Sequence, residues 1–533
     1  MGIRVTSVAN WATLIVCALS AGCSGQQQGP EAPTAGTAGL PAGEGGLSAG
    51  GNVSSGGSLS GGAAAGGSAG ANVAGSSSAG ANNTSGAANG GSNAAGGATS
   101  PGGSTNVAGA GPVQASGPCG LENPAFCEDF EGADKPGGRG GPLDENVWSV
   151  SRYGIASTIA IFTRLAATST ESGVENTPTL CGQQFSNLLP PNDIRLCASE
   201  GGSRRLEEVM NDAGAFGFTS MRIRQPFDFT GRVGTVAFEV DAKRNKDYDG
   251  HGWWTEIWIS KEPVPMPYHG APTVASYVTD AVGFQIAPAG GSCFGDVGCN
   301  QVGRVIVSKD YKLTRDTVIS DSGGFKVADG KGNRFKLLIS QDSAEFWASD
   351  FDNPNTLRRV AVVKELGLRF SVGYVHIQHA QYNASKANAS SSQTFRWDNI
   401  GFDGPKQAKP RAYEIDDDGY SAKPQEHQVG YSLSNPVSVS VKDVDLSAAK
   451  RAIFGFNLHA AGNKAFRYRF NGKEWHTFMT PSEFDSQITL RSFSVEVPLS
   501  ELVAGVNKLE MDQPQQDKPI EYVGNMDLTI DAQ

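Results

Sequence analysis

Residues 252–260 read GWWTEIWIS, a stretch in which two sets of side chains alternate. Successive side chains of a β-strand point to opposite faces, so the stretch divides into two faces if it is a strand. One face carries Trp253, Thr255, Ile257 and Ile259. The other carries Trp254, Glu256 and Trp258. We expect the aliphatic set to pack in a core and the second set to place a carboxylate between two indole rings on an outer face.

Similar runs recur along residues 118–405. They include FTSMRIRQPFDF, GTVAFEVDA, VGFQIAP and GRVIVSK, separated by Gly, Pro, Asn and Asp. Short alternating runs with frequent turn residues are typical of an all-β sandwich or jelly roll. The sequence therefore predicts such a domain over 118–405.

A second, smaller set of alternating runs occupies residues 410–533. Asn471-Gly472 separates KAFRYRF from KEWHTFM, and Asn-Gly between two such runs is a strong hairpin signal. We predict a C-terminal β-sandwich here, joined to the first domain by PKQAKPRAY.

The N-terminus has the layout of an export signal. Arg4 precedes an apolar run that is too short to cross a bilayer, and small residues lead into Cys23. The segment Leu19–Cys23 resembles a bacterial lipobox, although Ser20 stands where leucine is preferred. The resemblance implies a signal peptide over 1–22, lipidation of Cys23, and, with Ser24 next, an outer membrane lipoprotein at the extracellular surface. Ordinary signal cleavage, which would release a free secreted protein, is the alternative.

Residues 23–117 are dominated by Gly, Ala, Ser and Asn and have almost no charge. Such a composition buries too little apolar surface to offset the entropy of ordering. We expect a disordered low-complexity linker that acts as a stalk.

Six cysteines remain after Cys17 in the signal and Cys23 are set aside. Six cysteines allow fifteen pairings. Their spacing as sequence neighbours favours Cys119–Cys127, Cys181–Cys197 and Cys293–Cys299, and an even set without CxxC spacing fits an oxidising compartment.

Charge limits the partners. The chain has 18% charged residues, a formal net charge of −11, and no run of Lys and Arg. We expect no nucleic-acid partner, and contact with a membrane only through the lipid anchor.

The segments PAFCEDFEG (124–132) and FRWDNIGFDGP (395–405), with Trp148 following the first, resemble the first and last strands of concanavalin A-like lectin/glucanase jelly rolls. Bacterial surface lipoproteins carry such domains behind stalks of this composition. VPLSELVAGVNKLEM, in the second domain, is similar to strands of galactose-binding-like accessory β-sandwiches. The resemblance implies a ligand on the concave sheet of the jelly roll.

Alternation in the other runs places polar and aromatic residues on the same outer face as Glu256. Rings that stack on sugar faces and polar groups that bind hydroxyls suit a polysaccharide or other glycan. The predicted contact surface is Trp254, Glu256, Trp258, Tyr374, His376 and Gln378.

Two enzymatic alternatives stay open. Retaining glucanases of this fold carry Glu-x-Asp-x-x-Glu on one strand, but no second acid follows Glu256 here; Glu239 or Asp241 would have to partner it from another strand. Jelly-roll polysaccharide lyases use Arg, Gln, His and Tyr, and MRIRQ partly resembles their arginine strand. However, Ala287 follows Gln285-Ile286 where those enzymes have histidine. The catalytic candidates are Glu256, Arg224, His376 and Tyr382.

No cofactor is expected. His376 and His379 lie three residues apart along a predicted strand, so they point to opposite faces and do not chelate one ion together. Asp416 and Asp418 imitate part of a calcium loop, but Gln425 occupies the position of its bidentate Glu. We expect an acidic interdomain turn there, with Ca²⁺ as the weaker alternative.

These observations favour a surface-anchored polysaccharide-binding protein. The competing functions are a polysaccharide-degrading enzyme, lyase before hydrolase, and a structural adhesin without sugar specificity.

Overall fold

The computed structural model describes residues 117–532 with gaps. The gaps are 134–138, 140–142, 157–158, 162–178, 181–182, 185–191, 199–202, 212–215, 245–252, 271–274, 279, 287–300, 321–332, 351–352, 383–391, 416–429, 434–435, 462–464, 482–487 and 515–519. The predicted signal peptide, lipidation site and stalk lie outside the described residues. The part of the chain that is described contains no helix with the length and hydrophobicity needed to span a bilayer.

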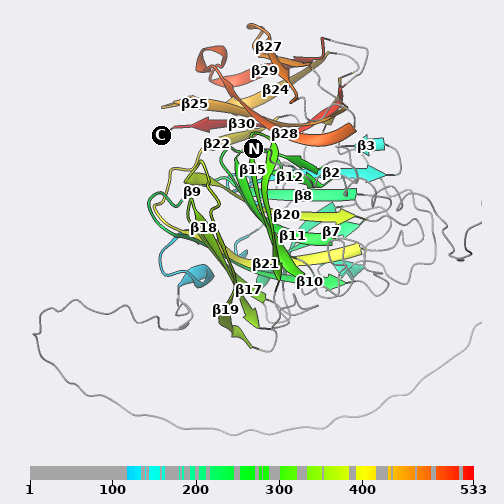
Figure 1. The fold of residues 1–533 in the computed structure, drawn as a ribbon. Coiled ribbons are helices and arrows are strands. Elements are labelled where there is room, and N and C mark those ends of the chain that lie inside the picture. The colour runs from blue at the N-terminus through cyan, green and yellow to red at the C-terminus, as the bar shows by residue number, and fades with distance from the viewer. Residues whose placement is uncertain are drawn as a thin grey trace, which may run out of the picture. The chain divides into compact units, whose positions relative to one another are not determined.

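The first domain is built from two antiparallel sheets (Figure 1). The eight-stranded sheet has the order β19 (Asn353–Lys364), β18 (Ser343–Asp350), β17 (Asn333–Ile339), β10 (Gly234–Arg244), β21 (Ser392–Asp403), β7 (Arg204–Asn211) and β6 (Asn192–Ala198), with β1 (Pro124–Glu128) also paired to β21.

The nine-stranded sheet has the order β16 (Lys312–Ser320), β15 (Gln301–Lys309), β14 (Ala281–Ile286), β11 (Trp253–Ser260), β20 (Val372–Tyr382), β8 (Phe216–Ile223), β2 (Trp148–Ala156) and β3 (Ile159–Ile161), with β9 (Phe227–Asp228) beside β20. The stretch that opened the sequence analysis is therefore a central strand, β11, between β14 and β20.

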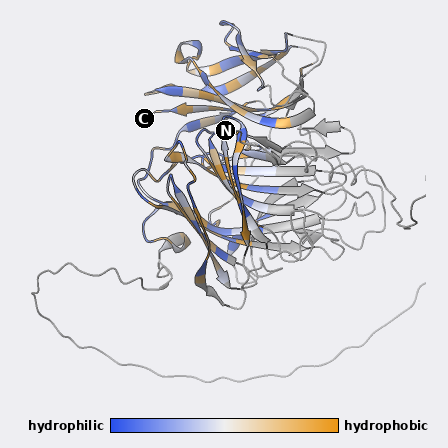
Figure 2. Ribbon diagram, viewed as in Figure 1, coloured by the Kyte–Doolittle hydropathy of each residue, from blue (hydrophilic) through white to orange (hydrophobic). Residues whose placement is uncertain are grey.

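The core of the first domain follows the predicted alternation. Ile257 and Ile259 of β11 pack with Val375 and Ile377 of β20 in one buried cluster with residues of the eight-stranded sheet. Aromatic rings fill the other side of this core: Phe238 stacks on Phe335 at 5.1 Å between ring centroids. The regular change from hydrophobic to hydrophilic residues along the strands is visible in Figure 2.

The second domain also has two antiparallel sheets. One contains β22 (Arg411–Glu414), β30 (Ile520–Asp531), β25 (Arg451–Ala461), β28 (Ile488–Val497) and β23 (Gly430–Ser432), and the other contains β24 (Val437–Val444), β29 (Gly505–Asp512), β26 (Ala465–Phe470) and β27 (His476–Met479). A separate cluster of buried residues, including Phe454, Phe456 and Leu509, forms its core.

The remaining elements are short. They are the hairpin of β12 (Tyr268–Gly270) and β13 (Ala275–Tyr277), the pair β4 (Thr179–Leu180) and β5 (Gln183–Gln184), and the 3-10 turns η1 (Pro118–Gly120) and η6 (Leu499–Glu501). No α-helix occurs in the described residues. The prediction of an all-β fold is confirmed, with a larger domain of two antiparallel sheets followed by a smaller β-sandwich.

The predicted Asn-Gly hairpin is confirmed. Asn471 and Gly472 both have positive φ, 51° and 68°, between the paired strands β26 and β27. Two successive residues with positive φ match the turn that favours Asn-Gly in hairpins.

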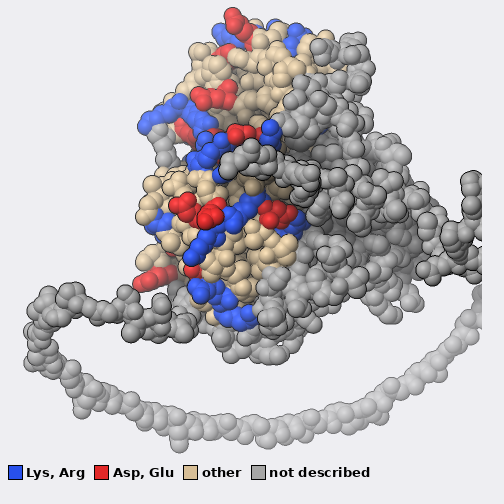
Figure 3. All heavy atoms as spheres, viewed as in Figure 1, with Lys and Arg blue, Asp and Glu red and all other residues tan. Residues whose placement is uncertain are grey.

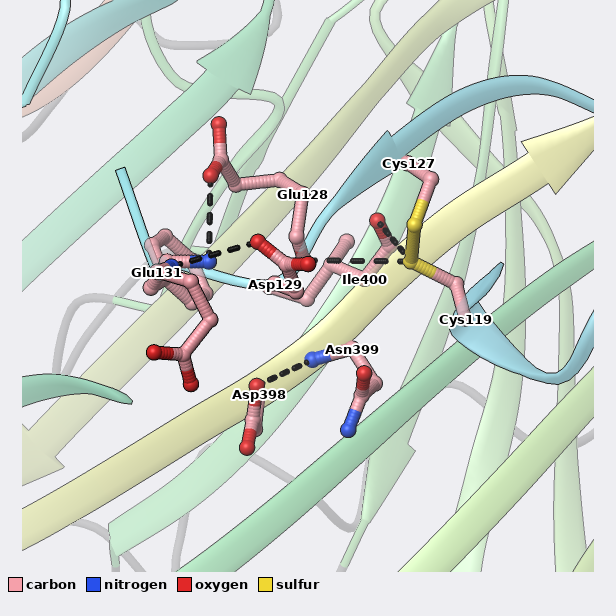
Figure 4. Close-up of a disulfide and its surroundings, with 9 residues drawn as sticks. Cys119, Cys127, Glu128, Asp129, Glu131, Asp398, Asn399 and Ile400 are labelled. Atoms are coloured by element: carbon pink, nitrogen blue, oxygen red, sulfur yellow. Dashed lines mark hydrogen bonds between the residues drawn. A yellow bond between two sulfur atoms is a disulfide. The ribbon is translucent and has the colours of Figure 1, made fainter. Parts of the chain in front are cut away.

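One predicted disulfide is described, and it is formed. Cys119 and Cys127 are bonded, which ties η1 to strand β1 (Figure 4). The side chains of the predicted pairs Cys181–Cys197 and Cys293–Cys299 lie outside the described residues.

Several acidic residues, among them Glu128, Asp129 and Asp398, lie near this disulfide (Figure 4). Asp398 has a large pKa shift. Burial raises the pKa of Asp398 to about 6, against the opposing effect of its hydrogen bond from the Asn399 N–H; Glu239, Glu131 and Asp129 raise it further. The folded state therefore holds this proton more tightly than the unfolded state between about pH 4 and 6, so stability falls as pH rises through that window.

We expect Asp398→Asn to stabilise the protein at pH 8 by about 1 kcal/mol, a value discounted for the partial exposure of the carboxylate. At pH 3 the substitution should be nearly neutral, because this pH lies below both the unfolded pKa of about 3.9 and the folded pKa of about 6, so Asp398 is mostly protonated in both states. Urea unfolding at the two pH values measures the difference. Asp342→Asn, at an exposed position in the β17–β18 turn, is the control, and an equal gain in both variants would contradict the assignment.

Candidate functional site

Polar side chains line up on the face of the nine-stranded sheet that points away from the main core. In one cross-strand row, Trp258 of β11 is opposite His376 of β20, and His376 is opposite Arg222 of β8. In the next row, Glu256 lies between Gln378 of β20 and Gln285 of β14. The structure thus brings together four members of the predicted contact surface.

The predicted contact surface requires these residues to be exposed to solvent, but they are buried. Glu256, Trp258, His376 and Gln378 are 0% exposed, and Tyr374 is buried as well. The pleat assigned from the sequence is right, since none of them packs in the main core. The expected exposure is corrected: other parts of the chain cover this face.

The cover over Trp258 is the segment that leaves β11 and returns to β14. Val264, Tyr268, Val278 and Ala281 from this segment form an apolar cluster with Trp258, and the rings of Trp258 and Tyr268 stack at 5.4 Å. On the sheet side the indole lies against Gly283, where an added Cβ would come within 2.4 Å of the ring. Glycine at this position lets the indole lie flat on the sheet.

Glu256 is the centre of a buried hydrogen-bond network. Its Oε2 accepts from Trp258 Nε1 and from Gln378 Nε2, both at 2.7 Å, and its Oε1 accepts from Gln285 Nε2 at 2.6 Å. Gln378 Nε2 also donates to the backbone oxygen of Tyr268 at 2.8 Å, so the network ties the cover to the sheet. A buried carboxylate with this many donors is held in one position.

His376 is held between two hydroxyls. Its Nε2 lies 2.8 Å from Ser260 Oγ and its Nδ1 lies 3.3 Å from Ser220 Oγ. Burial lowers the pKa of His376 well below its ordinary value, and the neighbouring Arg222 lowers it further. The imidazole is therefore neutral near pH 7 and fixes the spacing of β8, β11 and β20.

Arginines on this face meet the second domain. Arg222 donates to Asp527 of β30 at 3.1 Å, and Arg139 and Ser149 also donate to the Asp527 carboxylate. All four side chains are buried. Asp527 thus joins residues of both domains in one buried ionic cluster.

Glu256 and His376 lie in neighbouring rows of one face, but Arg224, another predicted catalytic group, is engaged elsewhere. Arg224 donates to the backbone oxygens of Trp148 and Ala412, at 3.1 and 2.5 Å, so it belongs to the contact between the domains. Glu239 lies on β10 of the other sheet and pairs with Arg334 at 2.7 Å; Asp241 shares that strand. Neither is placed to partner Glu256, which corrects that expectation.

Tyr382, the remaining catalytic candidate, lies at the end of β20 opposite Phe216 of β8, and its side chain is outside the described set.

The histidine pair behaves as predicted. His379 accepts a hydrogen bond from Trp397 Nε1 at 2.8 Å inside the core, on the face opposite to His376. Among the described residues there is no group of three or more His, Cys, Asp or Glu placed to hold a metal ion. Asp416 and Asp418 lie outside that part of the chain, so calcium binding there stays a prediction.

Aromatic residues occupy the next two rows of the same sheet. Tyr153 of β2 pairs with Phe218 of β8, Phe218 with Ala380 of β20, and Ala380 with Trp254 of β11. One row further, Phe216 pairs with Tyr382. By strand alternation these positions have the same parity as Glu256 and Gln378.

Sequence reasoning missed the cluster around Asp527. Asp527 has the parity of the polar residues in NMDLTI, and nothing local in that run indicates that it is buried against another domain. Figure 3 shows acidic and basic side chains interspersed over the described part of the visible surface. From its sequence alone, Asp527 would be expected on such a surface.

Comparisons with known proteins give no family. No family model matches the chain, and no curated protein matches it. Among solved structures, the chain is similar to lectin II from Ulex europaeus, at 11% identity over 40% of this chain and 90% of that chain, with a TM-score of 0.27. It is also similar to the exoplasmic/lumenal domain of VIP36 in a Ca²⁺- and mannose-bound form, at 14% identity over 40% and 84%, with a TM-score of 0.27.

A third similar structure is the Lotus tetragonolobus seed lectin, at 6% identity over 40% of this chain and 91% of that chain, with a TM-score of 0.27. At these scores the likeness carries no argument about function, and the fold rests on the strand pairing described above.

Proposed function

We propose that this chain binds carbohydrate on the nine-stranded sheet, at the end of β11 where Trp254 lies. The observation that carries the proposal is the row Tyr153–Phe218–Ala380–Trp254, in which aromatic residues flank one small residue at cross-strand spacing. Cross-strand neighbours lie about 5 Å apart, a spacing that suits a sugar ring resting on aromatic faces.

The buried network supports this site from the adjacent row. Glu256 and Gln378 are two residues from Trp254 and Ala380 along the same strands, and their hydrogen bonds fix the relative position of β11 and β20. Binding sites are more exact when a second layer of hydrogen bonds holds the strands that carry them. The buried residues therefore act as positioning residues: Glu256, Trp258, Tyr374, His376 and Gln378. We assign the contacts with sugar to the aromatic row instead.

Presentation at the cell surface is part of the proposal. Lipidation of Cys23 and a flexible stalk over 23–117 would place this domain outside an outer membrane, within reach of polysaccharide. Radiolabelled palmitate incorporation that is lost in Cys23→Ala tests the anchor, and unchanged incorporation would contradict it.

A glycan array followed by titration calorimetry tests the sugar site. We expect Trp254→Ala to weaken binding by about tenfold or more, as loss of an aromatic anchor does. Trp347→Ala is the matched control, because Trp347 is a half-buried indole on the other sheet and should leave affinity unchanged. Equal binding by both variants would refute the location.

The same preparation distinguishes the competing functions. Release of unsaturated uronate that disappears in Tyr382→Phe would replace the binding function with a lyase. Binding to no glycan, with adhesion to cells retained, would point to a structural adhesin.

A further inference from the structure

A pocket of about 530 Å³ lies on the eight-stranded sheet, on the face directed away from the core. Thr235 and Leu338, which line it, alternate along their strands with the core residues Val236 and Leu337. The pocket is therefore on a different sheet from the proposed sugar site and does not depend on that proposal.

The disulfide segment builds one wall of this pocket. Residues 120–123 line it, and they lie within the loop closed by the Cys119–Cys127 bond. Leu121 and Cys119 pack on Ala237 of β10, over Gly401 of β21, where an added Cβ would come within 2.9 Å of Cys119 Cβ. The wall is thus fixed covalently and by packing.

Lys336 of β17 lines the pocket and is only 9% exposed. It makes no hydrogen bond or ion pair with any other residue in the described part of the chain. Its Nζ is not among the fully buried atoms without a partner, so the ammonium is accessible from the pocket, where a bound anion would give it a partner. Burial lowers the pKa of Lys336 and Arg334 lowers it further, whereas Asp403 acts in the opposite direction.

Asp403, one of the two acids that line the pocket, is already bonded to other groups. Asp403 Oδ1 accepts from the Thr235 N–H at 2.8 Å and from Arg232. Arg232 lines the pocket as well, and its Nε is buried without a hydrogen-bond partner. Glu122 lines the pocket too, so the lining holds two cations and two carboxylates. Arg232 and Asp403 are paired with each other and Glu122 is exposed to solvent, which leaves the Lys336 ammonium as the cation that can bind a ligand with one negative charge.

We propose that this pocket binds a small carboxylate, held by the Lys336 ammonium and flanked by Arg232. Charge-assisted hydrogen bonds between ammonium and carboxylate supply the affinity. Leu121, Leu338 and Pro405 supply an apolar surface for the body of the ligand. The carboxylate could be that of a sugar acid or of a simple organic acid, and the probes below separate the two.

Titration calorimetry at pH 7 with glucuronate, glucose, butyrate and butanol tests the pocket. We expect binding of glucuronate, butyrate or both, with no binding of the uncharged counterparts. Hydrogen bonds to charged groups contribute about 1.5–3 kcal/mol, so Lys336→Gln should weaken binding by about tenfold or more. Lys364→Gln, at an exposed lysine of the same sheet, should leave it unchanged.

Two further measurements keep the result decisive. Lys336→Arg retains the charge and should retain most of the affinity, which separates loss of charge from loss of structure. Reductive ¹³C-methylation gives Lys336 an NMR signal whose pKa should rise when the carboxylate binds, and affinity should fall once pH exceeds that pKa. Binding of neither carboxylate, or equal binding by Lys336→Gln, would overturn the proposal.

Discussion

Asp527→Ala should destabilise the protein by about 3–5 kcal/mol, the cost of removing one member of a buried ionic cluster. Asp527 is fully buried and accepts from Arg222 at 3.1 Å, from Arg139 and from Ser149. Without the carboxylate, two guanidinium groups stay buried without their shared counter-ion. Urea unfolding at pH 7 measures the loss.

Asp512→Ala is the matched control. Asp512 also pairs with an arginine, Arg467, but both side chains are partly exposed. Exposed pairs contribute about 0–1 kcal/mol, so this variant should unfold near the wild-type midpoint. Equal losses in the two variants would show that burial of the Asp527 cluster does not set its contribution.

The pH dependence of the same cluster has a definite sign. Burial alone would raise the pKa of Asp527, but Arg139, Arg222 and Arg224, with the hydrogen bond from Ser149, bring it below its ordinary value. A carboxyl whose pKa is lower in the folded state stabilises the protein above its unfolded pKa of about 3.9, and that stability is lost as pH falls further. Asp527→Asn should therefore flatten the acid limb of the stability profile.

The alternation of side chains along β11 could be predicted from the sequence, and so could the residues of this strand that pack in the core. Ile257 and Ile259 pack between the sheets, while Glu256 and Trp258 face the other way. Side-chain parity is a local property of an extended chain, so a stretch of nine residues is enough to predict it. The Cys119–Cys127 bond was predictable for the same reason, since its half-cystines are close in sequence.

The burial of Glu256 and Trp258 could not be predicted from the sequence, because it depends on contacts with residues outside their own strand. Tyr268 covers Trp258 from the connection to β14, and Asp527 meets Arg222 across 305 residues. Aromatic and charged residues on a strand face suggest an open binding surface when only one domain is considered. The connection to β14 covers Trp258, the second domain supplies the partner of Arg222, and no pattern near Arg222 or Asp527 indicates the pairing.

The environment of Lys336 also could not be predicted from local sequence. Lys336 alternates with Phe335 and Leu337 as a surface lysine would, so its sequence position predicts a solvated ammonium. Lys336 is nevertheless mostly buried, and the disulfide segment packs on Ala237, its cross-strand neighbour in β10. The bond could be predicted from spacing, but the surface on which the closed loop rests could not.

Glu256→Ala is expected to cost about 4 kcal/mol, since it leaves three buried N–H donors without their acceptor. Trp258 Nε1, Gln378 Nε2 and Gln285 Nε2 all donate to this carboxylate at 2.6–2.7 Å. The chain offers a matched pair for comparison: Glu345 accepts from Trp347 Nε1 at 3.1 Å with the same two-residue spacing, but its side chain is 32% exposed. Glu345→Ala should cost less than about 1 kcal/mol, because water replaces the lost acceptor.

Glu256→Gln separates charge from shape in the same network. The amide keeps the volume and one acceptor oxygen, but its NH₂ group faces a neighbouring donor, so the loss should be about 2 kcal/mol. If Glu256 acts only by holding β11 and β20 in place, sugar affinity should fall in proportion to the loosening of the strands and recover when stability is restored elsewhere. A Glu256→Gln variant with wild-type stability and no sugar binding would instead make Glu256 a contact residue, which would require the segment around Tyr268 to open.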